Sequence, residues 1–496
     1  RAARQHLEAR AHRNRDVALL GGAVSHGAAI AGLVREALEE AERALTAAED
    51  WPEWEVDMRN RLAYLLFLLD DGEGSRAQSA RACEVARTLP PSGIVAWTYA
   101  HHGHLGLRLG SPDHALALRL AREALDVAVA SGEPLARIRC RGRLGHTLAW
   151  VGRGDDGLAE LRAAVEAARR ARDPLTEIEL SESLFQALLL TRTHRRHGPA
   201  TLADDLHERF LSRRSPLACH LPLPSLVHAF LQSGRWERAR EVVELMDDRH
   251  HEGEDHVATA VARAVMSWVL GRHDDAATTL RQLTGELIGP HWYDRYYPVR
   301  IEVTADAGDL DAARRIAEDY LSLDVGDSQQ AGKLGAISAL VRVEAMEAAR
   351  EPAAAEEHAD RARAALALGE ELLVRFPPLH DGSLAMETPA THLALARAEL
   401  TRLTGADPHA WEVARASVDH VRYRLHAGLR LAEALLRVGD IAAARGEAAV
   451  VLARSGRIGA RGLQQGAARL LTAGATHATG PSPVGRPGAA PHVRAW

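Results

Sequence analysis

The stretch Val269-Leu270-Gly271-Arg272-His273-Asp274-Asp275-Ala276 and its counterpart Ala305-Asp306-Ala307-Gly308-Asp309-Leu310-Asp311-Ala312 share one pattern. A segment of mainly apolar residues ends just before Gly, polar residues follow, and Ala opens the next segment. Gly readily takes the left-handed conformation that ends a helix, and Asp or Ser is a favoured N-cap of the helix that follows. The pattern therefore predicts a short turn between two α-helices.

This turn recurs along the chain. Gly234, Gly271 and Gly308 are separated by 37 residues each, and Gly110 and Gly152 by 42. A repeat of this length with two helices per unit is typical of a helical solenoid, in which each unit buries its apolar face against its neighbours. The glycines that carry the pattern are Gly74 (a weaker copy), Gly110, Gly152, Gly234, Gly271, Gly308 and Gly439.

The segments between the turns have the apolar spacing of amphipathic helices, at i, i+3, i+7 and i+10 or close to it. Aromatic residues make up only 4% of the chain, so Ala, Leu and Val must form most of the core. The clearest apolar faces are Leu158, Leu161, Val165 and Ala168, and Leu425, Leu429, Ala432 and Leu436. The tryptophans at repeat-like positions, which we predict to be core residues, are Trp51, Trp54, Trp97, Trp150, Trp236, Trp268 and Trp411.

The rhythm of the repeats suggests four parts. Helical repeats are expected over residues 1–195 and again over 225–475. Between them, 196–224 is rich in Pro and predicts an irregular connector, and a second break is expected at 376–390. The segment from about Gly474 to Trp496 is rich in Gly, Pro and Ala and predicts a disordered tail or linker, which we place at 476–496.

The repeats resemble tetratricopeptide repeats of variable length. The resemblance implies an all-α, tetratricopeptide-like helical-hairpin solenoid that winds as a right-handed superhelix. The last repeats also resemble those of large ATP-dependent bacterial transcription regulators of the LuxR type, and of signalling ATPases that carry tetratricopeptide repeats. The residues that carry this second resemblance are Trp411-Glu412-Val413-Ala414, Tyr423-Arg424-Leu425, Arg430 to Leu436, Gly439-Asp440 and Ala442-Ala443-Ala444.

Both chemical modules of such regulators are missing from this sequence. A phosphate-binding loop needs Gly, four residues, then Gly-Lys-Ser/Thr. The only lysine, Lys333, follows Gly332 but precedes Leu334, and Asp327 stands where the first Gly is required. No recognition-helix segment follows residue 475. The chain begins at Arg1 rather than Met, which is compatible with a segment of a longer protein.

Composition excludes several other classes. The formal net charge of −6, with both signs interspersed, argues against direct nucleic-acid binding by this segment. No run approaches the roughly 18 consecutive apolar residues that a membrane-spanning helix needs, so we expect no such helix. Cys83, Cys140 and Cys219 are far apart and odd in number, which favours a reducing cytoplasm over a disulfide framework.

One aromatic run is the candidate ligand-binding site. Tyr, Trp and Arg are the residue types that anchor binding surfaces, and in a superhelix they could face the concave groove. The alternative is that these rings fill a gap between repeats where Ala and Leu are too small. The candidate residues are His291, Trp292, Tyr293, Arg295, Tyr296 and Tyr297, within a run that ends at Pro298.

Two histidine clusters are candidate metal sites. The run Asp247 to His256 is dense in carboxylates and imidazoles, and His101 and His104 share a helix face. The first run lies where a polar loop between two helices is expected, and chance clusters are expected among the 26 histidines of the chain, so both are better explained without a metal. We therefore predict no metal, no cofactor and no catalytic residue, and leave a metal-dependent enzyme that uses the 247–256 loop as a remote alternative.

The leading hypothesis is a non-catalytic scaffold or sensor region of a bacterial signalling or transcription regulator. It would bind a protein, a peptide or a small effector in its concave groove, and a homo-oligomer is compatible with the sequence. The alternative is a free-standing tetratricopeptide adaptor for protein–protein interaction.

Overall fold

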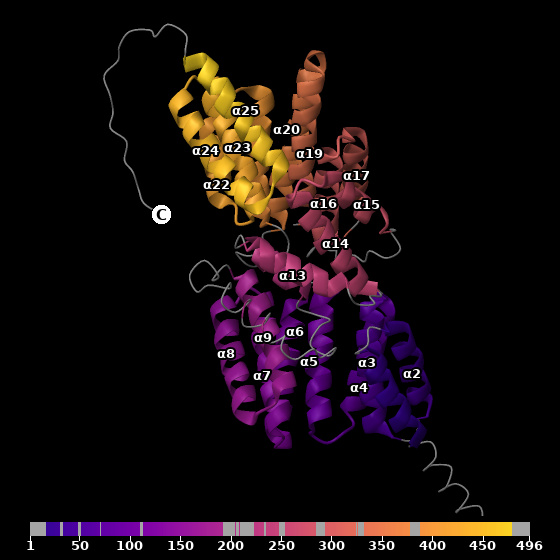
Figure 1. Cartoon of the computed structure of the whole chain (residues 1–496). Helices are drawn as coiled ribbons and strands as arrows, with labels where there is room; N and C mark the ends of the chain where they lie inside the picture. Colours follow the sequence, from indigo (N-terminus) through magenta and orange to yellow (C-terminus); the bar gives the residue numbers. More distant parts are fainter. Residues whose placement is uncertain are drawn as a thin grey trace, which may run out of the picture.

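The chain is all-helical wherever the structure describes it (Figure 1). The computed structural model describes residues 16–29, 33–47, 51–69, 71–109, 113–191, 204, 208, 223–232, 235–247, 253–283, 293–323, 325, 332–376 and 387–478. Within these ranges there is no β-strand. The predicted fold class, an all-α tetratricopeptide-like solenoid of helical hairpins, is confirmed.

The N-terminal half begins with a helix over residues 16–29 and continues as a series of hairpins. Its labelled helices are α2 (Val34–Thr46), α3 (Pro52–Leu68), α4 (Gly72–Ala86), α5 (Gly93–Arg108), α6 (His114–Ser131), α7 (Pro134–Trp150), α8 (Gly154–Ala171) and α9 (Pro174–Leu190).

The C-terminal half begins at α12, one residue before the predicted connector ends. Its helices are α12 (Leu223–Gln232), α13 (Trp236–Asp247), α14 (Gly253–Val269), α15 (His273–Arg281), α16 (Tyr293–Asp306), α17 (Leu310–Ser322), α19 (Lys333–Arg350), the 3₁₀ turn η4 (Pro352–Ala354), α20 (Ala355–Arg375), α21 (Pro389–Thr404), α22 (Pro408–Ser417), α23 (Val421–Arg437), α24 (Ile441–Ile458) and α25 (Arg461–Ala478).

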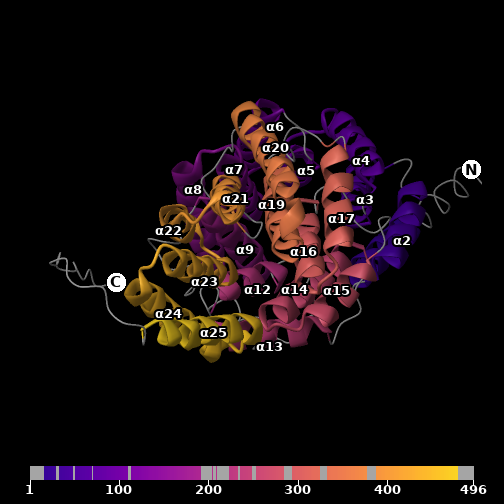
Figure 2. The same ribbon diagram turned by 90° about the horizontal axis from the view of Figure 1, so that it is seen from above.

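The hairpins stack in two layers. Each helix of the N-terminal half packs against the next in sequence, but α3, α5, α7 and α9 also pack against one another. They form an inner layer, and α4, α6 and α8 lie outside it, as the view from above in Figure 2 illustrates. Side chains on one face of the inner layer therefore come from four helices about 40 residues apart in sequence.

The predicted glycine turns are confirmed at four places. Gly152, Gly271, Gly308 and Gly439 have φ of 84°, 79°, 98° and 85°, the left-handed region in which Gly alone carries no steric penalty. Gly110 and Gly234 lie outside the described residues. The weaker copy at Gly74 is wrong as a helix end, because Gly74 lies in the first turn of α4.

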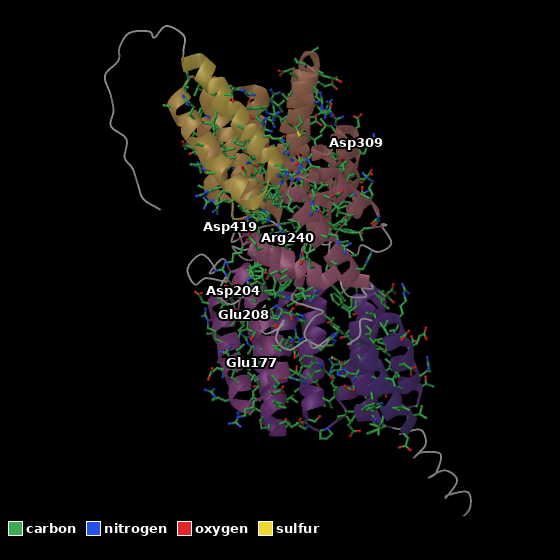
Figure 3. The ribbon with its side chains drawn as sticks, viewed as in Figure 1. Glu177, Asp204, Glu208, Arg240, Asp309 and Asp419 are labelled. Atoms are coloured by element: carbon green, nitrogen blue, oxygen red, sulfur yellow. The ribbon has the colours of Figure 1, made fainter. Side chains whose placement is uncertain are left out.

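At that position the turn is built without a left-handed glycine. Asp71 is the N-cap of α4, and its carboxylate accepts a hydrogen bond from the Gly74 amide at 2.7 Å. The predicted Asp caps hold at Asp113, Asp309 and Asp440. Figure 3 marks Asp309 at the periphery of the C-terminal half.

Glycine in the left-handed turn gives the first prediction. Gly271→Val is expected to lower the free energy of unfolding by about 1–2 kcal/mol, because a β-branched residue at φ 79° clashes with its own backbone. Gly271→Asn should cost less, since Asn tolerates this conformation. Thermal or urea melts of the two variants check this, and equal stabilities would contradict the role given to the turn.

The core consists of the predicted apolar faces. Leu158, Leu161, Val165 and Ala168 are all buried in one cluster between α7, α8 and α9. The largest cluster joins α9 and α12–α16 to α21–α23. Trp236, Trp268 and Trp411 are at most 3% exposed, as predicted for core residues.

The C-terminal end departs from the prediction by a few residues. Helix α25 continues to Ala478, past the start of the predicted tail at 476, because Gly474 is tolerated within a helix that has Ala-rich flanks. Residues 479–496 lie outside the described part. Among the described helices, none is long and apolar enough to cross a membrane.

Of the predicted connector at 196–224, the structure describes Asp204, Glu208 and the last two residues, which belong to α12. Asp204 and Glu208 lie between the N-terminal helices and α13 in Figure 3, and Asp204 forms an ion pair with Arg235 just before α13. The remainder of the connector up to residue 222 lies outside the described residues.

Candidate functional site

A cavity of about 370 Å³ opens on the inner layer of the N-terminal half. We call it the histidine pocket. Its size is within the range of ordinary small-ligand sites. The residues that line it are Asp57, Asn60, Arg61, Tyr64 and Phe67 on α3; Trp97, His101, His104, Leu105 and Arg108 on α5; Arg143 and His146 on α7; and Glu179, Glu182, Ser183 and Gln186 on α9.

The repeat explains how four helices supply one pocket. On each helix the lining residues are three or four positions apart, so they share one face. His104 on α5 and His146 on α7 are 42 residues apart, the same distance as Gly110 and Gly152. They occupy equivalent places in adjacent units, and their ring centroids are 5.0 Å apart.

The three histidines form the floor of the pocket, and all are at most 7% exposed. Burial, followed by the charge of Arg143, lowers the pKa of His101 to about 3. The same two causes hold the pKa of His104 and His146 well below 6.5. All three imidazoles are therefore neutral at pH 7 and act as hydrogen-bonding groups rather than cations.

The tautomer of His146 follows from its neighbour. Trp150 Nε1 can only donate, and it donates to His146 Nε2 at 2.8 Å. The proton of the neutral ring must then be on Nδ1. The Gln186 side chain raises the pKa of His146, but less than burial and the charges of Arg143 and Arg108 lower it.

Several polar atoms of the floor have no hydrogen-bond partner among the described residues. They are Asn60 Oδ1, His101 Nε2, His104 Nδ1 and His146 Nδ1. Each such atom costs about 1–3 kcal/mol when it is buried without a partner. Native folds keep few of them, and a cluster at a cavity marks a functional-site candidate.

Aromatic rings and two arginines form the walls. The Trp97 ring stacks with His101 at 5.9 Å, and Tyr64 lies 6.2 Å from the same imidazole. The Arg143 guanidinium lies 5.2 Å from the Trp97 ring, and Arg108 lies 4.6 Å from the Phe67 ring. The pocket thus combines flat apolar surfaces with positive charge, a combination suited to holding a flat ligand.

The predicted aromatic run lies elsewhere, on and before α16. His291 and Trp292 are outside the described residues. Tyr296 is fully buried and its hydroxyl donates to the Leu280 carbonyl at 3.2 Å. Tyr297 stacks on Tyr320 at 4.4 Å, and Tyr293 lies 5.3 Å from Tyr297.

These rings fill space between α16 and α17. This is the arrangement expected if the aromatic run packs between repeats instead of binding a ligand. The half-buried Arg295 is the remaining described residue of the candidate set. Neither cavity described here includes a residue of this run. Ligand binding by the run stays a prediction.

The metal alternatives have little support in the described residues. There, no group of three or more His, Cys, Asp or Glu side chains could hold a metal ion. His101 and His104 lie on one helix face as expected, but they face the pocket together with His146. Residues 248–252 of the acidic run lie outside the described part of the chain.

The C-terminal half contains a second cavity of about 270 Å³ beside a buried charge network. Asp306 at the end of α16 accepts hydrogen bonds from Arg342, Arg422 and Trp268. Arg342 also pairs with Glu302. These charges are at most 9% exposed and neutralise one another, so we interpret the network as a structural element.

Sequence reasoning missed the histidine pocket, although it had placed His101 and His104 on one helix face. Trp97 was predicted to be a core residue, whereas it is half-buried and lines the cavity. A signal was available in the spacing: polar and aromatic residues recur on the inner helices at the period of the glycines. A search for local clusters does not detect residues that are 42 positions apart.

The fold and the pocket together define the class: a helical-repeat protein with a ligand-sized cavity on its inner layer. No protein-family model and no curated protein matches the sequence.

Solved structures with a similar backbone include BtubC (BKLC) from P. vanneervenii, at 14% identity over 59% of this chain and 91% of that chain, TM-score 0.26. Yeast Tom70 is similar at 12% identity, over 93% of this chain and 96% of the Tom70 chain, with a TM-score of 0.33. The third is Naa15/Naa10 bound to HypK-THB, at 16% identity, over 92% of this chain and 66% of that chain, with a TM-score of 0.25.

Proposed function

We propose that the chain is a non-catalytic binding module whose histidine pocket takes a small effector or a side chain of a bound peptide. The observation that carries the proposal is the cluster of buried, unpartnered polar atoms beneath an aromatic-walled cavity of about 370 Å³. The hydroxyl of Ser183 donates to the Glu179 carbonyl oxygen at 3.2 Å rather than to one of the histidines, which supports binding over nucleophilic catalysis.

The wider context that we propose is the sensor region of a bacterial signalling or transcription regulator. The terminal repeats around Trp411 and Tyr423 support it through their resemblance to LuxR-type regulators. Sequencing the coding DNA on both sides tests it: a phosphate-binding loop upstream and a helix-turn-helix downstream are expected. Their absence would favour the free-standing adaptor.

Blocking the pocket tests the binding proposal. Ser183→Trp places a large ring among the lining residues, whereas Val129→Trp places the same ring on α6, at a position that is 58% exposed. Ligands come from two sources: peptides selected by phage display on the full chain, and small molecules from a cell extract that stay bound to the chain in native mass spectrometry. Both kinds should lose affinity for the Ser183→Trp variant and keep it for Val129→Trp. Equal binding by both variants, or no bound species at all, would refute the proposal.

A further inference from the structure

The distribution of charge in the histidine pocket indicates what kind of ligand it takes. We infer that the ligand is a monoanion, a carboxylate attached to a flat aromatic or similarly apolar body, with Arg143 as its charge partner. This inference rests on the proposed binding function of the pocket and adds the chemical class of the ligand.

Arg143 is the first observation. Its side chain is only 13% exposed, and its ion-pair partner, Glu179, lies 3.6 Å away. That is longer than the 2.7–2.9 Å of a charge-assisted hydrogen bond. The guanidinium makes no hydrogen bond to any described residue. Its nitrogen atoms are nevertheless not fully buried. Its N–H groups therefore reach the cavity.

The electrostatic environment is the second observation. Arg143 and Arg108 lower the pKa of both His104 and His146, the neighbouring imidazoles of His146 and His101 add to this effect at His104, and no carboxylate is among the causes at either ring. Burial lowers the pKa of Arg143 most, and the charge of Arg108 lowers it further, whereas the charges of Glu179 and Glu182 raise it. The local potential at these two rings is therefore positive, and it would attract an anion placed beside Arg143.

The acidic lining residues limit the charge of that anion. Asp57, Glu179 and Glu182 also line the cavity and would repel a dianion such as a phosphate monoester. A carboxylate matches the planar, two-pronged guanidinium and carries a single charge. The half-buried rings of Tyr64 and Trp97 offer flat apolar walls for the rest of the ligand.

A matched pair of probes tests the inference on the full chain. 2-Naphthoate and 2-naphthamide have nearly the same size and differ in charge, and Trp fluorescence or calorimetry reports their binding. We expect the naphthoate to bind about tenfold or more tightly than the amide, the range of a hydrogen bond to a charged group. 1-Naphthyl phosphate should bind more weakly than the naphthoate.

Two variants of opposite sign make the test specific. Arg143→Gln should abolish the preference for naphthoate over the amide, whereas Arg141→Gln should keep it, because Arg141 pairs with Glu160 at 2.6 Å on the outer side of α7. Glu179→Gln should strengthen naphthoate binding by removing the competing charge. This variant decides the matter if Arg143→Gln does not fold.

Equal affinity for naphthoate and amide, tighter binding of the phosphate, or no binding of any probe would overturn the inference. The proposed function fails separately, if Ser183→Trp leaves selected peptides and retained small molecules unaffected. If Ser183→Trp abolishes binding but naphthoate and naphthamide bind equally well, the binding function stands and a monoanionic ligand is excluded.

Discussion

Asp306→Asn is expected to lower the free energy of unfolding by about 3–5 kcal/mol, the range found when one partner of a buried ion pair is removed. The carboxylate of Asp306 accepts hydrogen bonds from Arg342, Arg422 and Trp268. Arg342 keeps Glu302 as an ion-pair partner after the substitution, but Arg422 loses its own and is left with the Trp268 ring, 4.1 Å from its guanidinium, and with the charge of Glu302. Urea unfolding of the purified chain measures the loss.

An exposed ion pair provides the matched control. Asp311 is 75% exposed and lies 3.6 Å from Arg314. Asp311→Asn should change stability by no more than about 0.5 kcal/mol, as is usual for exposed pairs. The double variant Asp306→Asn/Arg422→Met should recover part of the loss, since no unpaired buried charge remains. A small effect of Asp306→Asn alone would show that the network is dispensable.

The same carboxylate makes stability depend on acid. Burial alone would raise the pKa of Asp306, but the charges of Arg342 and Arg422 outweigh it and hold the pKa below its ordinary 3.8. A carboxyl with a lowered folded-state pKa stabilises the fold above its unfolded pKa and loses that contribution as pH falls toward the folded value. The stability difference between the parent and Asp306→Asn should therefore shrink as pH falls below about 4.

Gly157→Leu is expected to cost about 3 kcal/mol or more, because α7 and α8 cross with their backbones in contact at this point. A Cβ on Gly157 would lie 2.5 Å from the Gly145 carbonyl oxygen and 2.7 Å from the Ala149 amide nitrogen. Both are backbone atoms, so no side-chain rotation relieves the clash and the two helices must separate. Thermal melts followed by circular dichroism measure the effect.

The control for this variant is Gly446→Leu in α24. A Cβ at Gly446 meets no atom within 4 Å, and the residue is exposed. Because Leu favours a helix over Gly by up to about 1 kcal/mol, this variant should be neutral or stabilising. If both variants melted alike, the close crossing of α7 and α8 would be wrong.

The fold was predictable because its signals are local. A left-handed glycine such as Gly271, a cap such as Asp309 and an apolar face such as Leu158 to Ala168 each act within one or two helical turns. Their regular spacing then specifies a solenoid without knowledge of any long-range contact. Gly74 was misjudged because Asp71 caps α4 without help from a left-handed residue.

The pocket was not predictable in the same way. Its walls come from α3, α5, α7 and α9, and what makes them a site is burial without partners, which depends on three-dimensional packing. Trp97 illustrates the difficulty, since core and pocket-lining tryptophans have the same sequence pattern. Only the 42-residue spacing of His104 and His146 pointed toward equivalent inner positions.

The buried charge network also affects how the two halves come apart. In the N-terminal half, helices touch near neighbours, so its repeats can open one after another from an end. In the C-terminal half, Arg422 reaches Asp306 across 116 positions, and the turn at Gly271 lies against the start of α25. Because these contacts join helices that are far apart in sequence, we expect the C-terminal half to unfold in one step under a pulling force and the N-terminal half to unfold repeat by repeat.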